Sequence, residues 1–127
     1  MAVIWVAFGS AIGGAGRYWV FEMIARQYGG GFPWATLTVN VVGSLLIGVA
    51  AALTSPEGRF ELGGAGRQFL MLGLFGGFTT FSAFSLETLT LIQDADWWPA
   101  TGNVVASVGL CLVGVWAGYT LATVLNR

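Results

Sequence analysis

The sequence predicts an all-α membrane protein that crosses the bilayer with four helices. Hydrophobic residues make up 56% of the 127 residues, and charged residues make up only 9%. A soluble domain carries roughly 25% charged residues, so this chain lacks the polar coat that water requires. Four apolar stretches each reach the ~20 residues that a spanning helix needs. At this length the chain forms one domain, and residues 1–127 constitute a single four-helix transmembrane unit.

The four predicted helices cover residues 3–24, 34–54, 68–93 and 99–124. The first carries Arg17 and Glu22 near its end, the third has Glu87 as its only charge, and the other two are uncharged. Short polar or glycine-rich connections separate the four stretches, which places both termini on one side of the membrane. Because so small a unit cannot easily surround a pore, and because glycine is abundant in three of the helices, close helix packing and oligomerisation are expected.

The arginines barely fix an orientation in the membrane. Arg59, Arg67 and Arg127 fall on the side of the termini, Arg17 and Arg26 fall towards the other side, and the chain has no lysine. Positive residues normally mark the cytoplasmic side, so this near balance allows insertion both ways and hence an antiparallel dimer. The alternative, that the small bias fixes one orientation, is equally compatible with the charges.

Several functions are excluded by composition. The chain has no histidine and one cysteine, Cys111, so it forms no internal disulfide, no Cys/His zinc site and no Ser-His-Asp or Cys-His centre. Its net charge of −1 gives no electrostatic hold on nucleic acid. We expect neither an enzyme nor a nucleic-acid-binding protein.

Asn40 is the first polar residue that helix packing does not readily explain. It lies within the second apolar stretch, where an amide is costly unless it finds a partner or faces water. It could bond a neighbouring helix, or its NH₂ group could be a donor for a dehydrated anion. Taken alone, Asn40 favours the structural interpretation.

The third stretch contains residues 76–87, GGFTTFSAFSLE, which are unfavourable for a continuous helix. Paired glycines followed by paired threonines predict a break near the middle of the membrane, over Gly76–Thr79. Carbonyls freed at such depth often coordinate a cation. Beyond the break, Phe81 and Phe84 share one helical face, and an adjacent face carries two hydroxyls, those of Ser82 and Ser85.

These features together resemble the Fluc/CrcB family of fluoride channels. The resemblance rests on Thr38 and Asn40 in the second helix and on the motif at residues 76–87, and it extends over the whole chain. It implies a dual-topology antiparallel homodimer in the inner membrane of a bacterium, with two parallel fluoride pores. It also implies passive fluoride efflux that lowers cytoplasmic fluoride.

By the same resemblance, particular residues line the pore. Phe81 and Phe84 match the two pore phenylalanines, and Asn40 matches the pore asparagine. Gly76 and Thr79 match residues whose backbone carbonyls hold a structural sodium ion at the dimer centre. The implied partners are therefore fluoride, sodium, the lipid bilayer and a second copy of the chain.

The resemblance also implies roles for residues around the pore. Arg17 matches an arginine at the vestibule, and Glu87 matches a carboxylate near the pore. Ser82 and Ser85 lie where a track of hydroxyl groups begins, and Ser107 continues that track on the fourth helix. The chain departs from the pattern along this track at four positions, Ala83, Asn103, Cys111 and Val115, which leaves fewer hydroxyl groups to line it.

The main alternative is a small proton-coupled drug exporter, which also has four spans and can insert both ways. Such an exporter needs a carboxylate deep in the membrane to exchange a proton for a cation. Glu22 lies close to the end of the first helix, and Glu87 lies beyond the predicted break, so neither is well placed. A non-transporting assembly subunit would leave Asn40 and the break unexplained.

Overall fold

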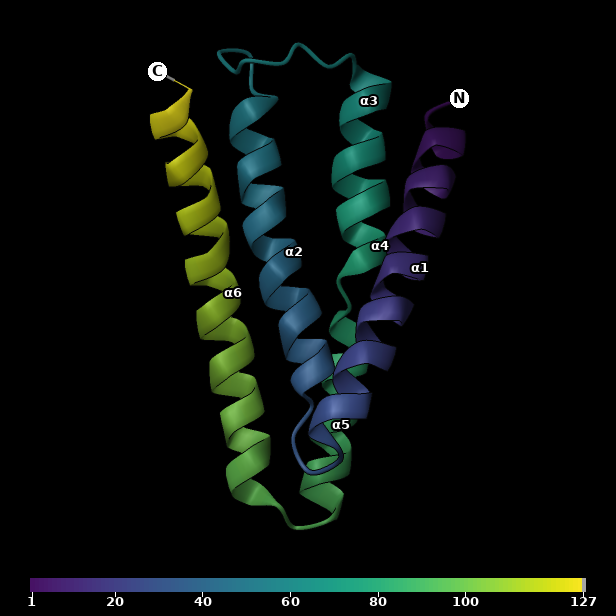
Figure 1. The fold of residues 1–127 in the computed structure, drawn as a ribbon, viewed down its shortest axis with the longest axis vertical. Coiled ribbons are helices and arrows are strands. Elements are labelled where there is room, and N and C mark those ends of the chain that lie inside the picture. The colour runs from purple at the N-terminus through teal and green to yellow at the C-terminus, as the bar shows by residue number, and fades with distance from the viewer. Residues whose placement is uncertain (127) are drawn as a thin grey trace.

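The computed structural model describes residues 1–126, in which every regular element is a helix and no β-strand is present (Figure 1). The elements in chain order are α1 (Ala2–Tyr28), α2 (Trp34–Leu53), α3 (Gly64–Gln68), the π-helix η1 (Phe69–Phe75), α4 (Gly76–Phe78), α5 (Phe81–Gln93) and α6 (Trp97–Leu125). The prediction of an all-helical protein is confirmed. Arg127, which contributes to the predicted charge bias, lies outside the described residues.

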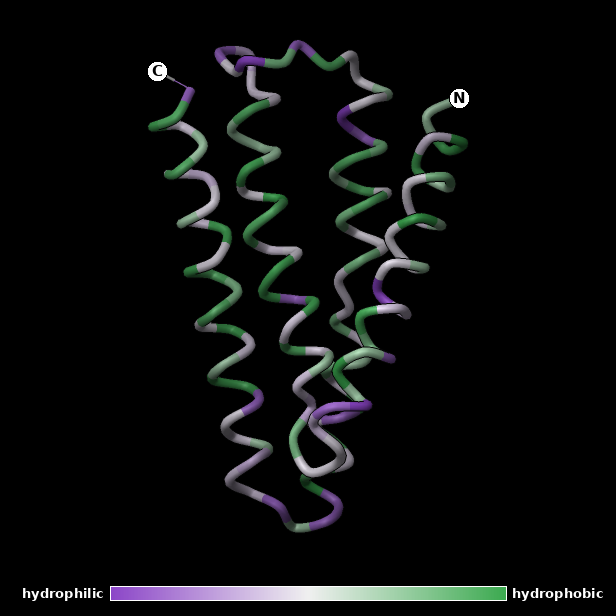
Figure 2. Tube along the Cα trace, in the orientation of Figure 1, coloured by the Kyte–Doolittle hydropathy of each residue, from purple (hydrophilic) through white to green (hydrophobic). Residues whose placement is uncertain are grey.

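The helices run up and down, and the packed pairs are not neighbours in sequence. The most extensive packing joins α2 to α6, and the next joins α1 to η1 and α4. The N-terminus, the end of α6 and the connection between α2 and α3 lie at one end of the molecule (Figure 1). Hydrophilic residues gather mostly in the connections, whereas the helices between them are largely apolar (Figure 2). This distribution suits a protein whose helices are surrounded by lipid.

Three helical segments of residues 1–126 are long and apolar enough to cross a membrane: Trp34–Leu53, Gly64–Gln93 and Trp97–Leu125. The helix α1 has 27 residues but is not among them. Glycine, serine and tyrosine dilute its apolar residues, and Arg17, Glu22 and Arg26 fall in its second half. The sequence predicted four apolar spans, and the hydropathy of the described helices supports three of them but not the first.

Glycines allow the packed helices to approach one another closely. A Cβ atom at Gly9 would lie 2.8 Å from the Cα of Gly73, and one at Gly13 would overlap the carbonyl of Leu74. On the other pair, a Cβ at Gly118 would overlap the carbonyl of Leu45. In lipid, such backbone contact is a main source of helix association, because burial of apolar side chains gains little there.

Candidate functional site

The helical path of Gly64–Gln93 is interrupted at Thr79 and Thr80. The helix α4 ends at Phe78, and α5 begins at Phe81. Between them Thr79 has ψ 161° and Thr80 has φ −151° and ψ 113°, so both residues are extended. The paired glycines of the predicted break are themselves helical, and the two threonines that follow them leave the helix instead. Threonine fits this role because its branched side chain favours extended backbone.

Local hydrogen bonds stabilise the interruption on both sides. The N–H and the hydroxyl of Thr79 both donate to the carbonyl of Phe75, at 3.0 Å each. The hydroxyl of Thr80 accepts a hydrogen bond from the N–H of Ala83 at 3.1 Å and so caps the first turn of α5. A threonine cap of this kind satisfies one of the N–H groups that the start of a helix leaves unpaired.

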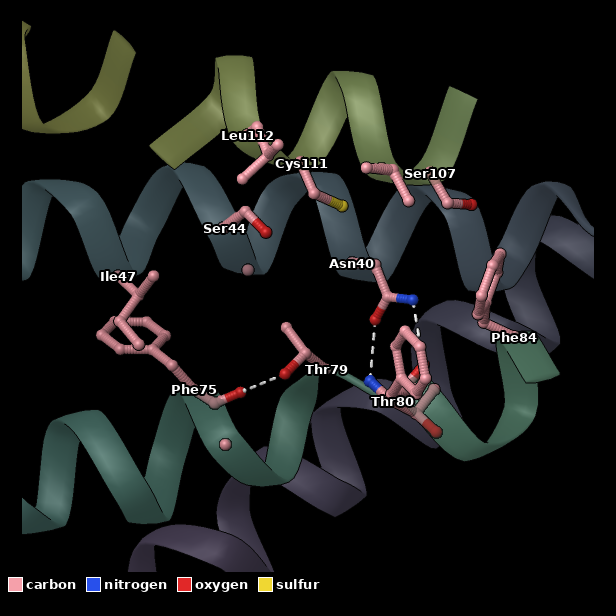
Figure 3. Close-up of a pocket in the computed structure, with 14 residues that line it drawn as sticks. Asn40, Ser44, Ile47, Phe75, Thr79, Thr80, Phe84, Ser107, Cys111 and Leu112 are labelled. Carbon is pink, nitrogen blue, oxygen red and sulfur yellow. Dashed lines mark hydrogen bonds between the residues drawn. The ribbon is translucent and has the colours of Figure 1, made fainter. Parts of the chain in front are cut away.

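Asn40 of α2 pairs with the backbone of Thr80 through two hydrogen bonds. Its Nδ2 donates to the Thr80 carbonyl at 2.9 Å, and its Oδ1 accepts from the Thr80 N–H at 2.7 Å (Figure 3). Asn40 is only 9% exposed. In a continuous helix the Thr80 N–H would donate to the carbonyl of Gly76, four residues earlier. The side chain of Asn40 thus takes the place of that helical partner.

Arg17 of α1 contacts the interruption from the other side. Its Nη1 donates to the carbonyl of Thr79 at 3.0 Å. The ion pair found among the described residues joins Arg26 to Glu22 at 3.6 Å and does not involve Arg17. Because the partner of Arg17 is a neutral carbonyl, its positive charge is not cancelled at the contact.

A pocket of about 410 Å³ lies between α2, the α4 end of the interruption, α5 and α6 (Figure 3). Its lining includes six of the residues that the sequence singled out: Asn40, Gly76, Thr79, Phe81, Phe84 and Ser107. Ser44 and Cys111 add a hydroxyl and a thiol to it. The fold therefore brings residues of three predicted helices to one cavity.

The two phenylalanines of this pocket form an aromatic pair. The ring centroids of Phe81 and Phe84 are 5.2 Å apart, with the ring planes tilted by 45°. Phe84 is 8% exposed, whereas Phe81 is 76% exposed in the single chain. Phe84 is thus part of the packed interior, and the ring of Phe81 lacks neighbours from its own chain over most of its surface.

A second pocket, of about 380 Å³, lies between α1 and α5. The polar residues of its lining are Arg17, Tyr18, Thr80 and Ser82. The Ser82 hydroxyl lies 3.2 Å from that of Thr80. Thr80 lines both pockets, so the interruption separates one cavity from the other.

Two predicted residues contribute to neither pocket. Ser85 donates its hydroxyl to the carbonyl of Phe81 on its own helix at 2.9 Å. The Oε1 of Glu87 accepts a hydrogen bond from the hydroxyl of Thr36 at 2.7 Å, and Thr36 is fully buried. The other carboxyl oxygen, Oε2, is buried without a partner among the described residues. In the single chain Glu87 belongs to the contact between α5 and α2.

Sequence reasoning did not find the role of Asn103 or of the second threonine. Asn103 is fully buried, donates to the Thr88 hydroxyl at 2.9 Å and accepts from Ser107 at 3.2 Å. It thereby holds Ser107 in place beside the pocket. A signal for Thr80 was present, because a threonine before a new helical run is a typical cap. No signal in the sequence identified the partners of Asn103.

Comparison with known proteins identifies the family of the chain. The profile of the family described as "CrcB-like protein, Camphor Resistance (CrcB)" matches residues 4–119. The chain is 54% identical over 123 residues to a protein of Opitutus terrae named "Fluoride-specific ion channel FluC", covering 97% of this chain and 93% of that one.

Two further proteins carry the same name. One from Paramagnetospirillum magneticum is 57% identical over 122 residues, with 96% of this chain and 95% of that one covered. One from Methylocella silvestris is 50% identical over all 127 residues and 97% of its own length. The resemblance that the third helix indicated is confirmed. With three helical segments able to cross a bilayer and near-complete coverage by these relatives, the chain is a multi-pass membrane protein that belongs to the CrcB family.

Proposed function

We propose that this protein is a fluoride-selective ion channel, through which fluoride leaves the cytoplasm passively. The observation that carries the proposal is the near-complete coverage by relatives named as fluoride-specific channels. Their sources are bacteria, and the inner membrane of a bacterium is the location we propose. Passive efflux there would lower cytoplasmic fluoride.

The chemistry of the first pocket is consistent with this cargo. Fluoride is small and strongly hydrated, so a pore must offer donors in place of the water it loses. Of the two Nδ2 hydrogens of Asn40, one donates to Thr80 and the other is free for an anion. The edges of Phe81 and Phe84 carry the positive end of the ring quadrupole. The pocket lining contains no lysine or arginine, and weak binding of this kind lets an ion leave as well as enter.

Arg17 supports the same proposal from the second pocket. Its charge is not paired with a carboxylate among residues 1–126, and Ser82 lines the same pocket. A positive group at the mouth of a pathway raises the local concentration of anions. We assign Arg17 to a vestibule, and Ser82, Ser85 and Ser107 to a polar track, with Glu87 close to it.

The working unit that we propose is an antiparallel, dual-topology homodimer with two pores. The exposed ring of Phe81 argues for it, because one chain leaves the pocket open on that side. In this unit α1 also crosses the membrane, in addition to the three more apolar segments. The interruption at Thr79 and Thr80 breaks the segment Gly64–Gln93 near the middle of the membrane. The near balance of arginines on the two sides supports insertion both ways.

Sodium is the structural ion that we propose for the dimer centre. The carbonyl of Gly76 loses its helical donor, since the Thr80 N–H is given to Asn40. The carbonyl of Thr79 likewise loses the N–H of Ala83, which is given to the Thr80 hydroxyl, and it accepts Arg17 through one of its two lone pairs. Both carbonyls therefore have acceptor capacity left. No cluster of three His, Cys, Asp or Glu exists within residues 1–126, and carbonyl oxygens alone suit a monovalent cation better than calcium.

The test of the proposed function is anion efflux from liposomes that contain the purified protein. We expect rapid fluoride efflux, much slower chloride efflux and no requirement for a proton gradient. Comparable chloride efflux would contradict the selectivity, and strict proton coupling would favour the exporter. The exporter is less favoured because Glu87 is bonded to Thr36 outside both pockets and Glu22 pairs with Arg26.

A further inference from the structure

We propose that Asn40 is a positioning residue, whose carboxamide holds the interruption open and so fixes the direction in which α5 leaves it. This role is distinct from that of a hydrogen-bond donor to fluoride. It rests on the proposed channel function only where fluoride efflux is measured. The observation that carries it is the pair of hydrogen bonds between Asn40 and the backbone of Thr80, at 2.9 and 2.7 Å.

These two hydrogen bonds occupy the N–H and the carbonyl of Thr80, which a continuous helix would use for its own backbone bonds. A side-chain amide has the same donor and acceptor as a peptide group, so Asn40 can satisfy both backbone groups of Thr80 at once. While it does so, the Thr80 N–H cannot return to Gly76, and the helix cannot close across the two threonines. If Asn40 is removed, a buried N–H and a buried carbonyl lose their partners, and the backbone of Thr80 is no longer held in one conformation.

The surroundings of Asn40 are built for this contact. One turn further along α2, Gly43 lies against the methyl group of Thr79, and a Cβ atom there would overlap that methyl. It would also come within 3.2 Å of the Phe78 ring. The absence of a side chain at Gly43 thus lets α2 approach the interruption closely enough for Asn40 to reach Thr80.

Loss of this restraint would change both the pore and the proposed ion site. Phe81 follows Thr80 directly, so a change in the backbone of Thr80 turns its ring away from the pocket. Whenever the Thr80 N–H turns back to the Gly76 carbonyl, that carbonyl loses its capacity for a cation. Asn40 therefore couples the direction of Phe81 to the availability of the Gly76 carbonyl, because both depend on the backbone conformation of Thr80.

The first experiment compares Asn40→Leu and Asn40→Asp by hydrogen exchange at the Thr80 amide in purified protein in detergent or nanodiscs. In Asn40→Leu the amide should exchange about tenfold faster or more, the change expected for loss of one ordinary buried hydrogen bond. An Asp carboxylate still accepts from the N–H, so Asn40→Asp should keep most of the protection although its charge abolishes flux. Asn103→Leu is the matched control, because it removes a second buried asparagine whose partners are side chains, and it should leave Thr80 unchanged.

A second variant guards against failure of Asn40→Leu to fold. An ester in place of the Thr80 amide removes the N–H and leaves the side chain of Asn40 intact. It should lower fluoride efflux at least about tenfold, as Asn40→Leu does. If Asn40 served only as a fluoride donor, the ester would conduct normally and Thr80 would stay protected in Asn40→Leu, and either result overturns the proposal. Absence of fluoride efflux from the wild-type protein would instead refute the channel function and leave the exchange measurement valid.

Discussion

Arg17 on α1 donates a hydrogen bond to the carbonyl of Thr79, joining two residues 62 positions apart at a distance of 3.0 Å. The contact ties the first helix to the interruption and leaves a positive charge beside the second pocket. The side chain of Arg17 therefore both holds the backbone of Thr79 and supplies positive charge to the second pocket.

We expect Arg17→Met to reduce fluoride efflux by roughly ten- to a hundredfold, because a hydrogen bond from a charged donor is worth about 1.5–3 kcal/mol. Arg17→Lys keeps the charge and should retain part of the flux. The matched control is Arg26→Met, which removes an arginine of the same helix that is exposed and paired with Glu22. Efflux from liposomes with equal amounts of dimer measures the effect, and equal losses in both methionine variants would argue against a special role for Arg17.

A second prediction concerns the contribution of the ring edges of Phe81 and Phe84 to fluoride efflux. Phe81→Ile and Phe84→Ile keep apolar volume but remove the aromatic quadrupole, so fluoride efflux should fall at least about tenfold. Within one chain Phe81→Ile should lose little packing because that ring is exposed there, whereas Phe84→Ile should also lose packing inside the chain. Phe8→Ile on the exposed face of α1 is the control. Normal efflux from well-assembled dimers of both pocket variants would show that the two phenylalanines only pack and do not bind fluoride.

Adjacent glycines on α1 offer a sharp test of the helix packing. A Cβ atom at Gly13 would overlap the Leu74 carbonyl, while one at Gly14 would meet nothing within 4 Å. Gly13→Ala should therefore destabilise the protein by roughly 1–3 kcal/mol, and Gly14→Ala should be nearly neutral. Thermal unfolding in detergent and the yield of folded protein compare the two. Similar stability of both variants would show that α1 and η1 do not pack as closely as described.

Removal of sodium tests the proposed ion at the dimer centre. If the Gly76 and Thr79 carbonyls bind sodium in the folded dimer, stability should rise with sodium concentration, by about 2.7 kcal/mol at one hundred times the dissociation constant. An impermeant organic cation at equal ionic strength should have no such effect. Thermal unfolding across a sodium titration gives the answer, and identical curves in the two salts would rule the ion out.

The arginine balance predicts where the C-terminus lies. A reporter fused there should be found on both sides of the membrane, since the side of the termini has only a small excess of positive charge. Lysines added to the connection between α2 and α3 should force one orientation and lower efflux, because antiparallel partners become scarce. A single location in the unmodified protein would contradict dual topology.

The sequence predicted the all-helical fold and the three most apolar spans, because apolar length is a property of each segment by itself. The two partners of the interruption were not predictable in the same way. Asn40 and Thr80 are 40 positions apart, and Arg17 and Thr79 are 62 apart, so these contacts depend on how the helices pack. The family resemblance indicated that Asn40 and Arg17 matter but not that both bind backbone at adjacent residues. The π-helix η1 also had no signal in composition, since Phe69–Phe75 reads as an ordinary apolar run.

The predicted site was recovered unevenly for a physical reason. Residues whose side chains project from one face near the interruption, such as Phe84 and Ser107, lie together at the first pocket. Ser85 and Glu87 find partners on their own helix or on α2 instead. A hydroxyl or carboxylate in an apolar setting bonds to the nearest available group, and a pattern of spacing alone does not specify that group.

The packing of α1 against η1, and of α2 against α6, has a consequence for synthesis. A nascent chain delivers α1 and α2 to the membrane before either closest partner has left the ribosome. At roughly 5–20 residues per second, the first two helices wait several seconds with their glycine faces against lipid. The first hairpin thus enters the membrane before those glycines find a backbone to pack against, so charges in the connections rather than glycine contacts orient it at that stage.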